Sequence, residues 1–298
     1  MKKEPIFRGS CTAITTPFTN GEIDYDRLDE QIDFQYSGGT SALVVCGTTG
    51  ENASLTPYEH EEMIEHVCRY SDGRMKIIAG VGSNDTQKAL KFSKAAQHYG
   101  ADGILMVTPY YNKTTQEGLV KHFCYVADKS ALPMIVYNVP SRTSIGIKLK
   151  TYIELSKHPN INGIKEASAD FSLFGLTRAH CGDELNVWSG NDDNTVPMMS
   201  LGAAGVISVA SNIVPSAVSK LCSLCLEGNF AAAQNLYFKY ADLFSMLFVE
   251  TNPIPVKAAM KLLGFDSGEL RLPLIDISAP ALEKLKSAML KSGLKLNE

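Results

Sequence analysis

The chain has 298 residues, of which 45% are hydrophobic, 20% charged and 8% aromatic. Its formal net charge of -4 argues against nucleic acid as a partner, because phosphate binding requires clustered lysine and arginine. The longest apolar runs fall far short of the roughly 18 residues that a membrane span needs. Arg8 interrupts the N-terminal apolar stretch before a signal-peptide core can form. We therefore expect a soluble, cytoplasmic protein that binds neither membrane nor nucleic acid.

The cysteines favour reduced thiols over a disulfide framework, because seven of them are scattered between Cys11 and Cys225. Cys222 and Cys225 have the Cys-x-x-Cys spacing that redox and zinc sites use. They lie, however, in a segment whose apolar pattern predicts a helix, and no second pair completes a zinc site. We interpret them as buried thiols and predict no metal site.

Short apolar runs alternate with helix-length segments along most of the chain. Eight runs, spaced roughly 20 to 35 residues apart, have the repeat length of βα units in a parallel sheet. They are apolar throughout, as is typical of strands that are covered on both faces. Among the intervening segments, Thr56, Pro57 and Glu59 form a helix-start signal. The predicted strands begin near Cys11, Ser41, Lys76, Gly103, Met134, Asn162, Asn186 and Gly205.

Eight such repeats predict an α/β fold, a (β/α)8 TIM barrel over residues 1–227. The last barrel helix is expected at 215–227. Residues 228–298 are expected to form a C-terminal helical domain, with helices at 230–249, 253–263 and 279–292. A doubly wound sheet is the alternative. It usually carries a nucleotide-binding loop, and the glycines at 80 and 82 lack the third glycine of that motif.

In TIM barrels the active site lies at the carboxyl ends of the strands. The residues that follow the predicted strands are rich in glycine and hydroxyl side chains, and none of the six histidines lies there. The chain has neither a His-Glu-x-x-His motif nor a Gly-x-Ser-x-Gly elbow. Asp192 and Asp193 follow the seventh strand and begin a helix, so we interpret them as helix caps rather than as a catalytic acid pair.

Lys165 stands out because it directly follows an apolar run and so lies at the mouth of the predicted barrel. It is either a solvated strand-end lysine or a Schiff-base nucleophile. A lysine of ordinary pKa is almost fully protonated at pH 7, so the second role requires desolvation or a nearby cation, and an apolar barrel interior can provide the desolvation. Tyr137 ends the neighbouring strand, where its phenol either transfers protons or packs in the core.

Other polar residues at the strand ends suit an anionic substrate. Thr48 and Thr49 either donate hydrogen bonds to a carboxylate or form a tight turn between two glycines. Arg142 either grips a carboxylate with its planar guanidinium group or serves solubility at the surface.

Five segments stand out in order along the chain: residues 47–51, 108–112, 137–143, 163–167 and 252–257. Together they resemble the 4-hydroxy-tetrahydrodipicolinate synthase (dihydrodipicolinate synthase) family, and the resemblance runs from about Phe7 to Leu294. It implies a class I, pyruvate-dependent aldolase-type lyase of lysine and diaminopimelate biosynthesis. Such an enzyme condenses pyruvate with L-aspartate 4-semialdehyde through a lysine Schiff base, giving 4-hydroxy-tetrahydrodipicolinate. It requires no cofactor, because the lysine imine is the electron sink.

The resemblance also implies a role for each site residue. Lys165 would form the imine, with a proton relay of Tyr137, Thr49 and a Tyr111 that reaches in from a neighbouring subunit. Arg142 would bind the carboxylate of the semialdehyde. A homotetramer built from two tight dimers is implied as well. The full set of implied substrate-binding residues is Thr48, Thr49, Arg142, Ile207, Gly190 and Asn252.

Two other functions are alternatives. N-acetylneuraminate lyase and related 2-oxo-acid aldolases share the lysine, the tyrosine and the glycine-threonine turn, but sugar-specific relatives lack Arg142 in its Pro-Ser-Arg-Thr context. A non-catalytic ligand-binding barrel is disfavoured, because Lys165, Tyr137, Thr49 and Tyr111 occur together with Arg142.

Lysine-inhibited members of the family have an allosteric cleft at a subunit interface that resembles one region of this chain. Two positions differ here, since Pro57 replaces a histidine and Lys88 replaces a glutamate. A cationic Lys88 would repel the ammonium groups of lysine, so we expect weak or absent inhibition. The residues of the corresponding region are Asn52, Ala53, His60, Asn84 and Tyr110.

Overall fold

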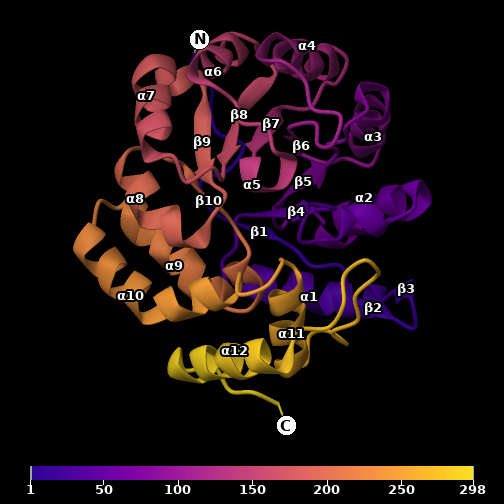
Figure 1. Ribbon diagram of the computed structural model, residues 1–298, viewed down its shortest axis with the longest axis vertical. Helices are drawn as coiled ribbons and strands as arrows, with labels where there is room; N and C mark the ends of the chain where they lie inside the picture. The colour runs from indigo at the N-terminus through magenta and orange to yellow at the C-terminus, as the bar shows by residue number, and fades with distance from the viewer. Residues whose placement is uncertain (1, 298) are drawn as a thin grey trace.

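A computed structural model describes residues 2–297, in which eight parallel strands close into a barrel (Figure 1). The barrel closes where β1 pairs with both β4 and β10. Every strand begins within two residues of its predicted start, and the predicted TIM barrel is confirmed. The strands are β1 (Gly9–Ala13), β4 (Ala42–Val45), β5 (Lys76–Gly80), β6 (Gly103–Val107), β7 (Met134–Asn138), β8 (Ile161–Glu166), β9 (Asn186–Ser189) and β10 (Gly205–Ser208).

Helices follow the strands and surround the barrel. The helix α2 begins with the predicted cap: Thr56 Oγ1 accepts from the Glu59 amide, and the Glu59 carboxylate accepts from the Thr56 amide. None of the helices within residues 2–297 is long and apolar enough to cross a membrane. The α-helices around the barrel are α1 (Tyr25–Ser37), α2 (Pro57–Ser71), α3 (Thr86–His98), α4 (Gln116–Ala127), α5 (Pro140–Thr143), α6 (Leu149–Ser156), α7 (Phe171–Cys181), α8 (Thr195–Ser200) and α9 (Pro215–Leu226). The 3-10 helices are η1 (Asn52–Ser54), η2 (Gly182–Glu184), η3 (Asp192–Asn194) and η4 (Ala210–Asn212).

A small antiparallel hairpin, β2 (Phe18–Thr19) and β3 (Glu22–Ile23), lies between β1 and α1 and has no counterpart in the sequence prediction. Each of its strands has only two residues, which is too short to give an apolar run or an alternation. The buried Phe18 is the residue of this hairpin that matters below.

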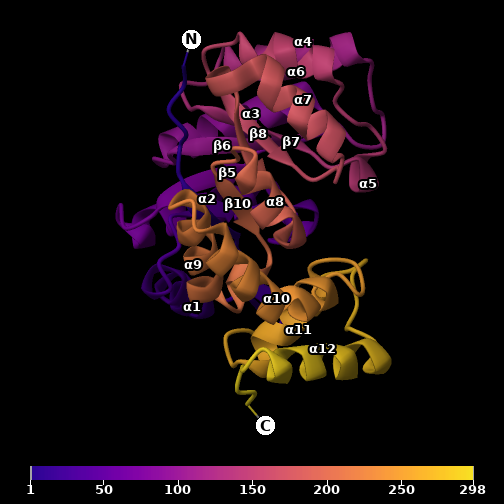
Figure 2. The same cartoon turned by 90° about the vertical axis from the view of Figure 1, so that its left-hand side faces the viewer.

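Three helices follow the barrel, as predicted: α10 (Phe230–Met246), α11 (Ile254–Leu262) and α12 (Ala279–Lys291). Figures 1 and 2 both place α11 and α12 at the end of the molecule that is farthest from the N-terminus. The helix α11 contacts η4, which directly follows β10. The C-terminal segment thereby reaches the carboxyl-end loops of the barrel. The division into domains at residue 227 stays a prediction.

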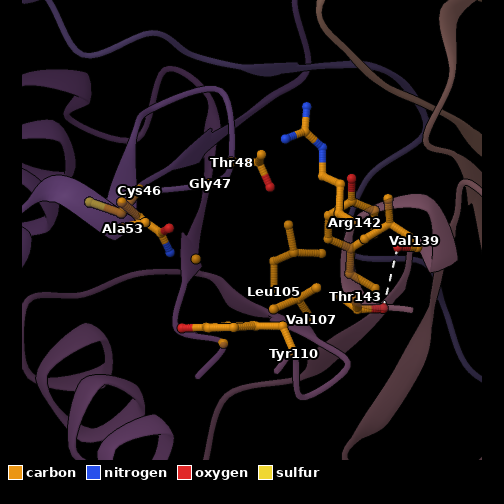
Figure 3. A pocket seen from close by; sticks show the side chains of 14 residues that line it. Cys46, Gly47, Thr48, Ala53, Leu105, Val107, Tyr110, Val139, Arg142 and Thr143 are labelled. Atoms are coloured by element: carbon orange, nitrogen blue, oxygen red, sulfur yellow. Dashed lines mark hydrogen bonds between the residues drawn. The ribbon is translucent and has the colours of Figure 1, made fainter. Parts of the chain in front are cut away.

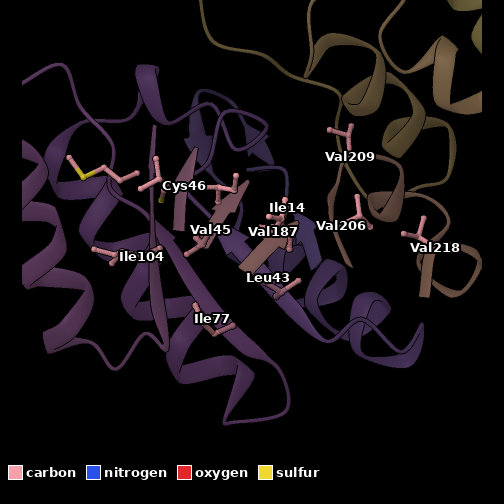
Figure 4. Packing of buried hydrophobic residues seen from close by; sticks show 14 of the residues in the cluster. Ile14, Leu43, Val45, Cys46, Ile77, Ile104, Val187, Val206, Val209 and Val218 are labelled. Atoms are coloured by element: carbon pink, nitrogen blue, oxygen red, sulfur yellow. The ribbon is translucent and has the colours of Figure 1, made fainter. Parts of the chain in front are cut away.

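Side chains alternate between two buried layers, because successive residues of a strand point to opposite faces of the sheet. In β4, Leu43 and Val45 pack outward against the helices (Figure 4), whereas Ala42 and Val44 belong to the cluster inside the barrel. The same alternation in β8 places Ile164 in the outer layer. Lys165, the next residue, therefore points into the barrel.

Cys222 and Cys225 lie on α9 and are buried free thiols, as predicted. Burial raises the pKa of the Cys225 thiol to about 11 and that of Cys222 further. Both thiols therefore stay protonated at neutral pH, which makes them poor nucleophiles and poor metal ligands.

Candidate active site

The candidate active site centres on Lys165 and Tyr137, which are direct partners in the pairing of β7 with β8. The Lys165 Nζ atom lies 4.3 Å from the centroid of the Tyr137 ring. Lys165 is 6% exposed and Tyr137 is 7% exposed. On the other side of Lys165, its partner in β9 is the fully buried Trp188. The structure thus places a primary amine over the ring of Tyr137 inside the barrel, with Tyr137 and Trp188 as its partners on the two neighbouring strands.

Gly190 leaves room for that amine. A Cβ atom at this position would lie 3.2 Å from Cε of Lys165 and 2.7 Å from Cβ of Ala167. Any larger side chain would therefore displace the lysine. Ile207 lies in the same interior cluster as Tyr137, on β10. The structure thus places Gly190 against Lys165, and Ile207 inside the barrel two strands away from it.

A buried carboxylate fixes the outer side of the same two strands. Glu166 accepts hydrogen bonds from Asn138 Nδ2 at 3.1 Å and from the Tyr152 hydroxyl at 2.6 Å. Burial and the Glu166 charge raise the pKa of the Tyr152 phenol, so it stays protonated and donates. The sequence analysis missed this network. Asn138 directly follows Tyr137, and Glu166 directly follows Lys165, so strand alternation points both polar side chains outward. Polar residues at these two positions were the signal in the sequence.

The turn after β4, residues 47–51, carries the two predicted threonines. Thr49 is buried, and its Oγ1 accepts a hydrogen bond from Nδ2 of Asn252 at 3.0 Å. Arg142 donates from Nη2 to the main-chain oxygen of Asn252 at 3.0 Å. Because Thr49 is an acceptor in this bond, its hydroxyl hydrogen is left to donate to another group. Three residues that are far apart in sequence are thus joined at the site.

A cavity of about 190 Å³ opens at the mouth of the barrel. Thr48, Tyr137 and Arg142 line it, and Figure 3 shows Thr48 and Arg142 together at its edge. Leu105 and Val107 form an apolar wall. This volume is small compared with drug-binding pockets, so the cavity suits a substrate of a few heavy atoms. Both wall residues point inward by strand alternation, a signal that the sequence analysis did not use.

Tyr111 does not contact Tyr137 of the same chain. Its side chain is 91% exposed, and its φ of 66° turns the backbone into the left-handed region. The neighbouring Tyr110 lines the cavity instead. The predicted relay through Tyr111 therefore requires a second copy of the chain, and it stays a prediction.

The five possible allosteric residues do not share one pocket in the single chain. Asn52, Ala53 and Tyr110 line the cavity just described, and Figure 3 shows the last two. Asn84 lines a second cavity, of about 450 Å³.

His60, the fifth of these residues, is buried and stacks on Phe92 with ring centroids 3.9 Å apart. Its Nε2 lies 2.8 Å from the oxygen of Gly80. Burial lowers the pKa of His60, so the ring is neutral at pH 7. Lys88 extends over the other ring of this stack, with its Nζ 5.6 Å from the Phe92 centroid.

Asp192 is the first residue of η3, but its carboxylate caps the start of η4. It is buried, and its carboxylate accepts from Ser208 Oγ at 2.5 Å and from the amides of Val209 and Ala210 at 3.1 and 3.0 Å. Asp192 is therefore a helix cap, as predicted, but the amides that it caps are those at the start of η4, whereas its own helix η3 has no side-chain cap. Across residues 2–297, no three His, Cys, Asp or Glu side chains are grouped to hold a metal ion.

Comparison with known proteins identifies relatives along nearly the whole chain. The Dihydrodipicolinate synthetase family matches residues 6–292. The 4-hydroxy-tetrahydrodipicolinate synthase of Thermoanaerobacter sp. (strain X514) is 46% identical over 291 residues, which cover 97% of this chain and 98% of that enzyme. The dihydrodipicolinate synthase of Aquifex aeolicus has a TM-score of 0.96 at 44% identity, covering 98% of this chain and 100% of that structure.

A third relative is known in complex with pyruvate. It is the dihydrodipicolinate synthase of Acinetobacter baumannii, with a TM-score of 0.95 at 39% identity, and the match covers 97% of this chain and 100% of that one. Sequence and structure agree over the same length, and the resemblance found in the sequence is confirmed. The chain is an enzyme, and it belongs to the dihydrodipicolinate synthetase family.

Proposed function

We propose that this enzyme condenses pyruvate with L-aspartate 4-semialdehyde through a Schiff base on Lys165, releasing 4-hydroxy-tetrahydrodipicolinate and one water. The observation that carries the proposal is the buried Lys165 amine, which lies 4.3 Å from the centroid of the Tyr137 ring, and Tyr137 in turn lines the small cavity. An amine needs an apolar site of this kind to act as a nucleophile near neutral pH. Its curated relatives carry the name of this activity.

The chemistry follows from the imine. The Lys165 nitrogen attacks the keto carbon of pyruvate, and the keto oxygen leaves as water. The cationic imine acidifies the adjacent methyl group, which loses a proton to give an enamine. The enamine carbon attacks the aldehyde of the second substrate, whose own amine then displaces Lys165 and closes the ring. The imine supplies the electron sink, so we propose no cofactor.

Proton transfers in these steps need donors and acceptors at the lysine. The Tyr137 phenol lies beside the amine and can carry the proton that the departing keto oxygen requires. The Thr49 hydroxyl has its oxygen occupied by Asn252, which leaves its hydrogen to donate toward Tyr137 or a bound carboxylate. We assign Tyr111 of a neighbouring subunit to the end of this relay, because its exposure leaves it available to a second chain.

The substrate carboxylates would be held at the two sides of the cavity. Thr48, Thr49 and the main chain near Ile207 would bind the carboxylate of pyruvate, next to the lysine. Arg142 at the cavity edge would bind the carboxylate of the semialdehyde, because its planar guanidinium group can donate two parallel hydrogen bonds. Gly190 keeps space for the imine, and Asn252 orients Thr49.

We further propose a cytoplasmic homotetramer, built from two tight dimers in which Tyr111 crosses the dimer interface. The support is the position of Tyr111, which is 91% exposed and directly follows a residue that lines the cavity. An active site that needs a residue from a second chain ties activity to assembly. Dilution below the dimer dissociation constant should therefore reduce the specific activity.

The test is to trap the imine with pyruvate and borohydride and then to map the modified peptide by mass spectrometry. We expect one adduct per chain, on Lys165, and none in Lys165→Ala. Activity with L-aspartate 4-semialdehyde, and none with N-acetylmannosamine, separates this function from a sugar-acid lyase. No adduct on Lys165, or full activity in Lys165→Ala, would overturn the proposal.

A further inference from the structure

A buried ion pair lies directly behind the pyruvate-holding turn, where the C-terminal segment meets the barrel. Lys257, on α11, donates from Nζ to Oε1 of Glu51 at 2.9 Å, and the two side chains are 0% and 1% exposed. Lys257 also donates to the main-chain oxygen of Thr16 at 2.8 Å and lies 4.4 Å from the centroid of the Phe18 ring. No step of the proposed mechanism uses this second buried amine.

A buried ion pair of this kind fixes the relative positions of the segments that carry its two charges, and it contributes little to the free energy of unfolding. Both charges lose their hydration on burial, and apolar side chains of similar volume often give an equally stable protein. The pair does, however, require its partners to stay in one arrangement, because a displaced ammonium or carboxylate would be left buried and unpaired. Lys257 and Glu51 therefore fix α11 against the end of the turn.

The turn needs such support because its backbone is strained at its last residue and at the residue that precedes the turn. Cys46 and Glu51 have φ values of 55° and 52°, in the left-handed region that side-chain-bearing residues disfavour. Glu51 is held through both carboxylate oxygens, since its Oε2 accepts from the Arg271 amide at 3.1 Å. Thr16 adds a bond from Oγ1 to the main-chain oxygen of Gly50 at 2.7 Å. These contacts over-determine the conformation of residues 49–51.

The same C-terminal segment reaches the turn a second time. Asn252, two residues before α11, donates to Thr49 Oγ1, and Lys257 binds Glu51 two residues further along the turn. A movement of α11 would therefore shift the hydroxyl of Thr49 and the backbone that carries it together.

We propose that the buried Lys257–Glu51 pair positions the Thr48–Thr49 turn for pyruvate, so that α11 completes the active site. Both are positioning residues, because they act through the turn. The inference rests on the proposed function, in which these threonines hold the pyruvate carboxylate. It adds that pyruvate affinity depends on a contact between the barrel and the C-terminal helices.

The experiment measures the pyruvate concentration that gives half-maximal borohydride trapping on Lys165. In Lys257→Met and in Glu51→Gln we expect this concentration to rise roughly tenfold, because a displacement of about 1 Å in a positioning group has effects of this size or larger. A purely structural role would lower the amount of folded enzyme and leave the trapping concentration of the remainder unchanged.

Two further variants keep the test decisive if a single variant does not fold. The double variant Lys257→Met/Glu51→Gln removes both charges of the pair and should fold, with the same rise in the trapping concentration. Glu51→Asp keeps the charge and shortens the side chain by one methylene, and a smaller rise is expected. Leu285→Ala is the matched control. Leu285 is buried on α12, and its truncation leaves a cavity in the core. The variant should therefore have a lower Tm and an unchanged trapping concentration.

The outcomes separate the two proposals. If the unaltered enzyme forms no adduct on Lys165, the proposed function fails and this inference fails with it. If the unaltered enzyme forms the adduct and the folded double variant traps pyruvate at the same concentration, only the positioning role is overturned. An equal rise in Leu285→Ala would also overturn it, because general destabilisation would then explain the effect.

Discussion

Asn252 donates a hydrogen bond to Thr49 although 203 residues separate the two in sequence. The bond sets the direction in which the Thr49 hydroxyl can donate. We expect Asn252→Ala to raise the KM for pyruvate roughly fivefold, since a neutral hydrogen bond contributes about 1 kcal/mol. Steady-state kinetics at saturating semialdehyde measure this. Asn229→Ala, which removes an exposed cap of α10, is the control and should leave the KM unchanged.

Arg142 should discriminate between the two substrates. We expect Arg142→Ala to raise the KM for the semialdehyde by roughly 10- to 100-fold, since a hydrogen-bonded ion pair with a carboxylate is being removed. Pyruvate trapping on Lys165 should change little. Arg142→Lys should recover little of the loss, because an ammonium group cannot donate two parallel hydrogen bonds. A matching loss of pyruvate affinity would contradict the assignment of Arg142 to the second substrate.

L-Lysine should inhibit this enzyme weakly or not at all. Lys88 places a cation beside the His60–Phe92 stack, where it would repel the ammonium groups of lysine. We expect less than half inhibition at about 1 mM lysine, at the upper end of ordinary metabolite affinities. The double variant Lys88→Glu/Pro57→His should become more sensitive. Submillimolar inhibition of the unaltered enzyme would refute the prediction.

Asp266 should make the enzyme less stable as the pH rises. Burial is the main cause that raises the pKa of this carboxyl to about 6, against the charge of Lys257 and the amide of Gly268, which lower it, while Glu51 and Asp24 raise it further. A carboxyl whose pKa is higher in the folded than in the unfolded protein costs no stability at a pH below the unfolded-state pKa. The cost develops as the pH rises through the folded-state pKa.

Asp266→Asn cannot ionise, so its advantage over the unaltered protein should appear between pH of about 4 and 7. The free energy of unfolding should then favour the variant by about 1 to 3 kcal/mol more at the higher pH. Urea unfolding at both ends of this range measures the difference. If the difference in unfolding free energy between the variant and the unaltered protein did not depend on pH, Asp266 would not be protonated in the folded protein near pH 5.

Tyr111 should act in the site of a neighbouring chain. We expect Tyr111→Phe and Lys165→Ala each to lose most activity as pure proteins. After mixing and reassembly, each mixed dimer would contain one site with both an intact Lys165 and a partner's Tyr111. About one quarter of the unaltered activity should return if the chains assort at random in dimers. No recovery, with mixed dimers demonstrated by native mass spectrometry, would place Tyr111 outside the relay.

Features that depend on local sequence were predictable here. The eight strands begin where their apolar runs begin, and the cap at Thr56 forms as its sequence predicts. Lys165 and Tyr137 were also found, because each lies at the end of a strand and neighbouring parallel strands end at one edge of a sheet. In both cases the information lies within a few residues.

Contacts between distant segments were not predictable from pattern. Glu51 and Lys257 are 206 residues apart, and each alone resembles an ordinary solvated charge. Asp192 was interpreted as a cap of its own helix because the sequence does not show that η4 lies beside it. His60 lies on α2 as its neighbours suggest, but its burial against Phe92 depends on how α2 and α3 pack.

The contacts of Asn252 and Lys257 with the turn also set an order of events during synthesis. A ribosome releases all eight barrel strands before it releases α11. A nascent chain that ends after α9 contains the strands that carry Lys165 and Tyr137. The turn after β4 still lacks its hydrogen bonds from Asn252 and Lys257. All eight strands are therefore available before α11 is made, and under the proposed positioning of the turn the competence to bind pyruvate would arrive only with α11.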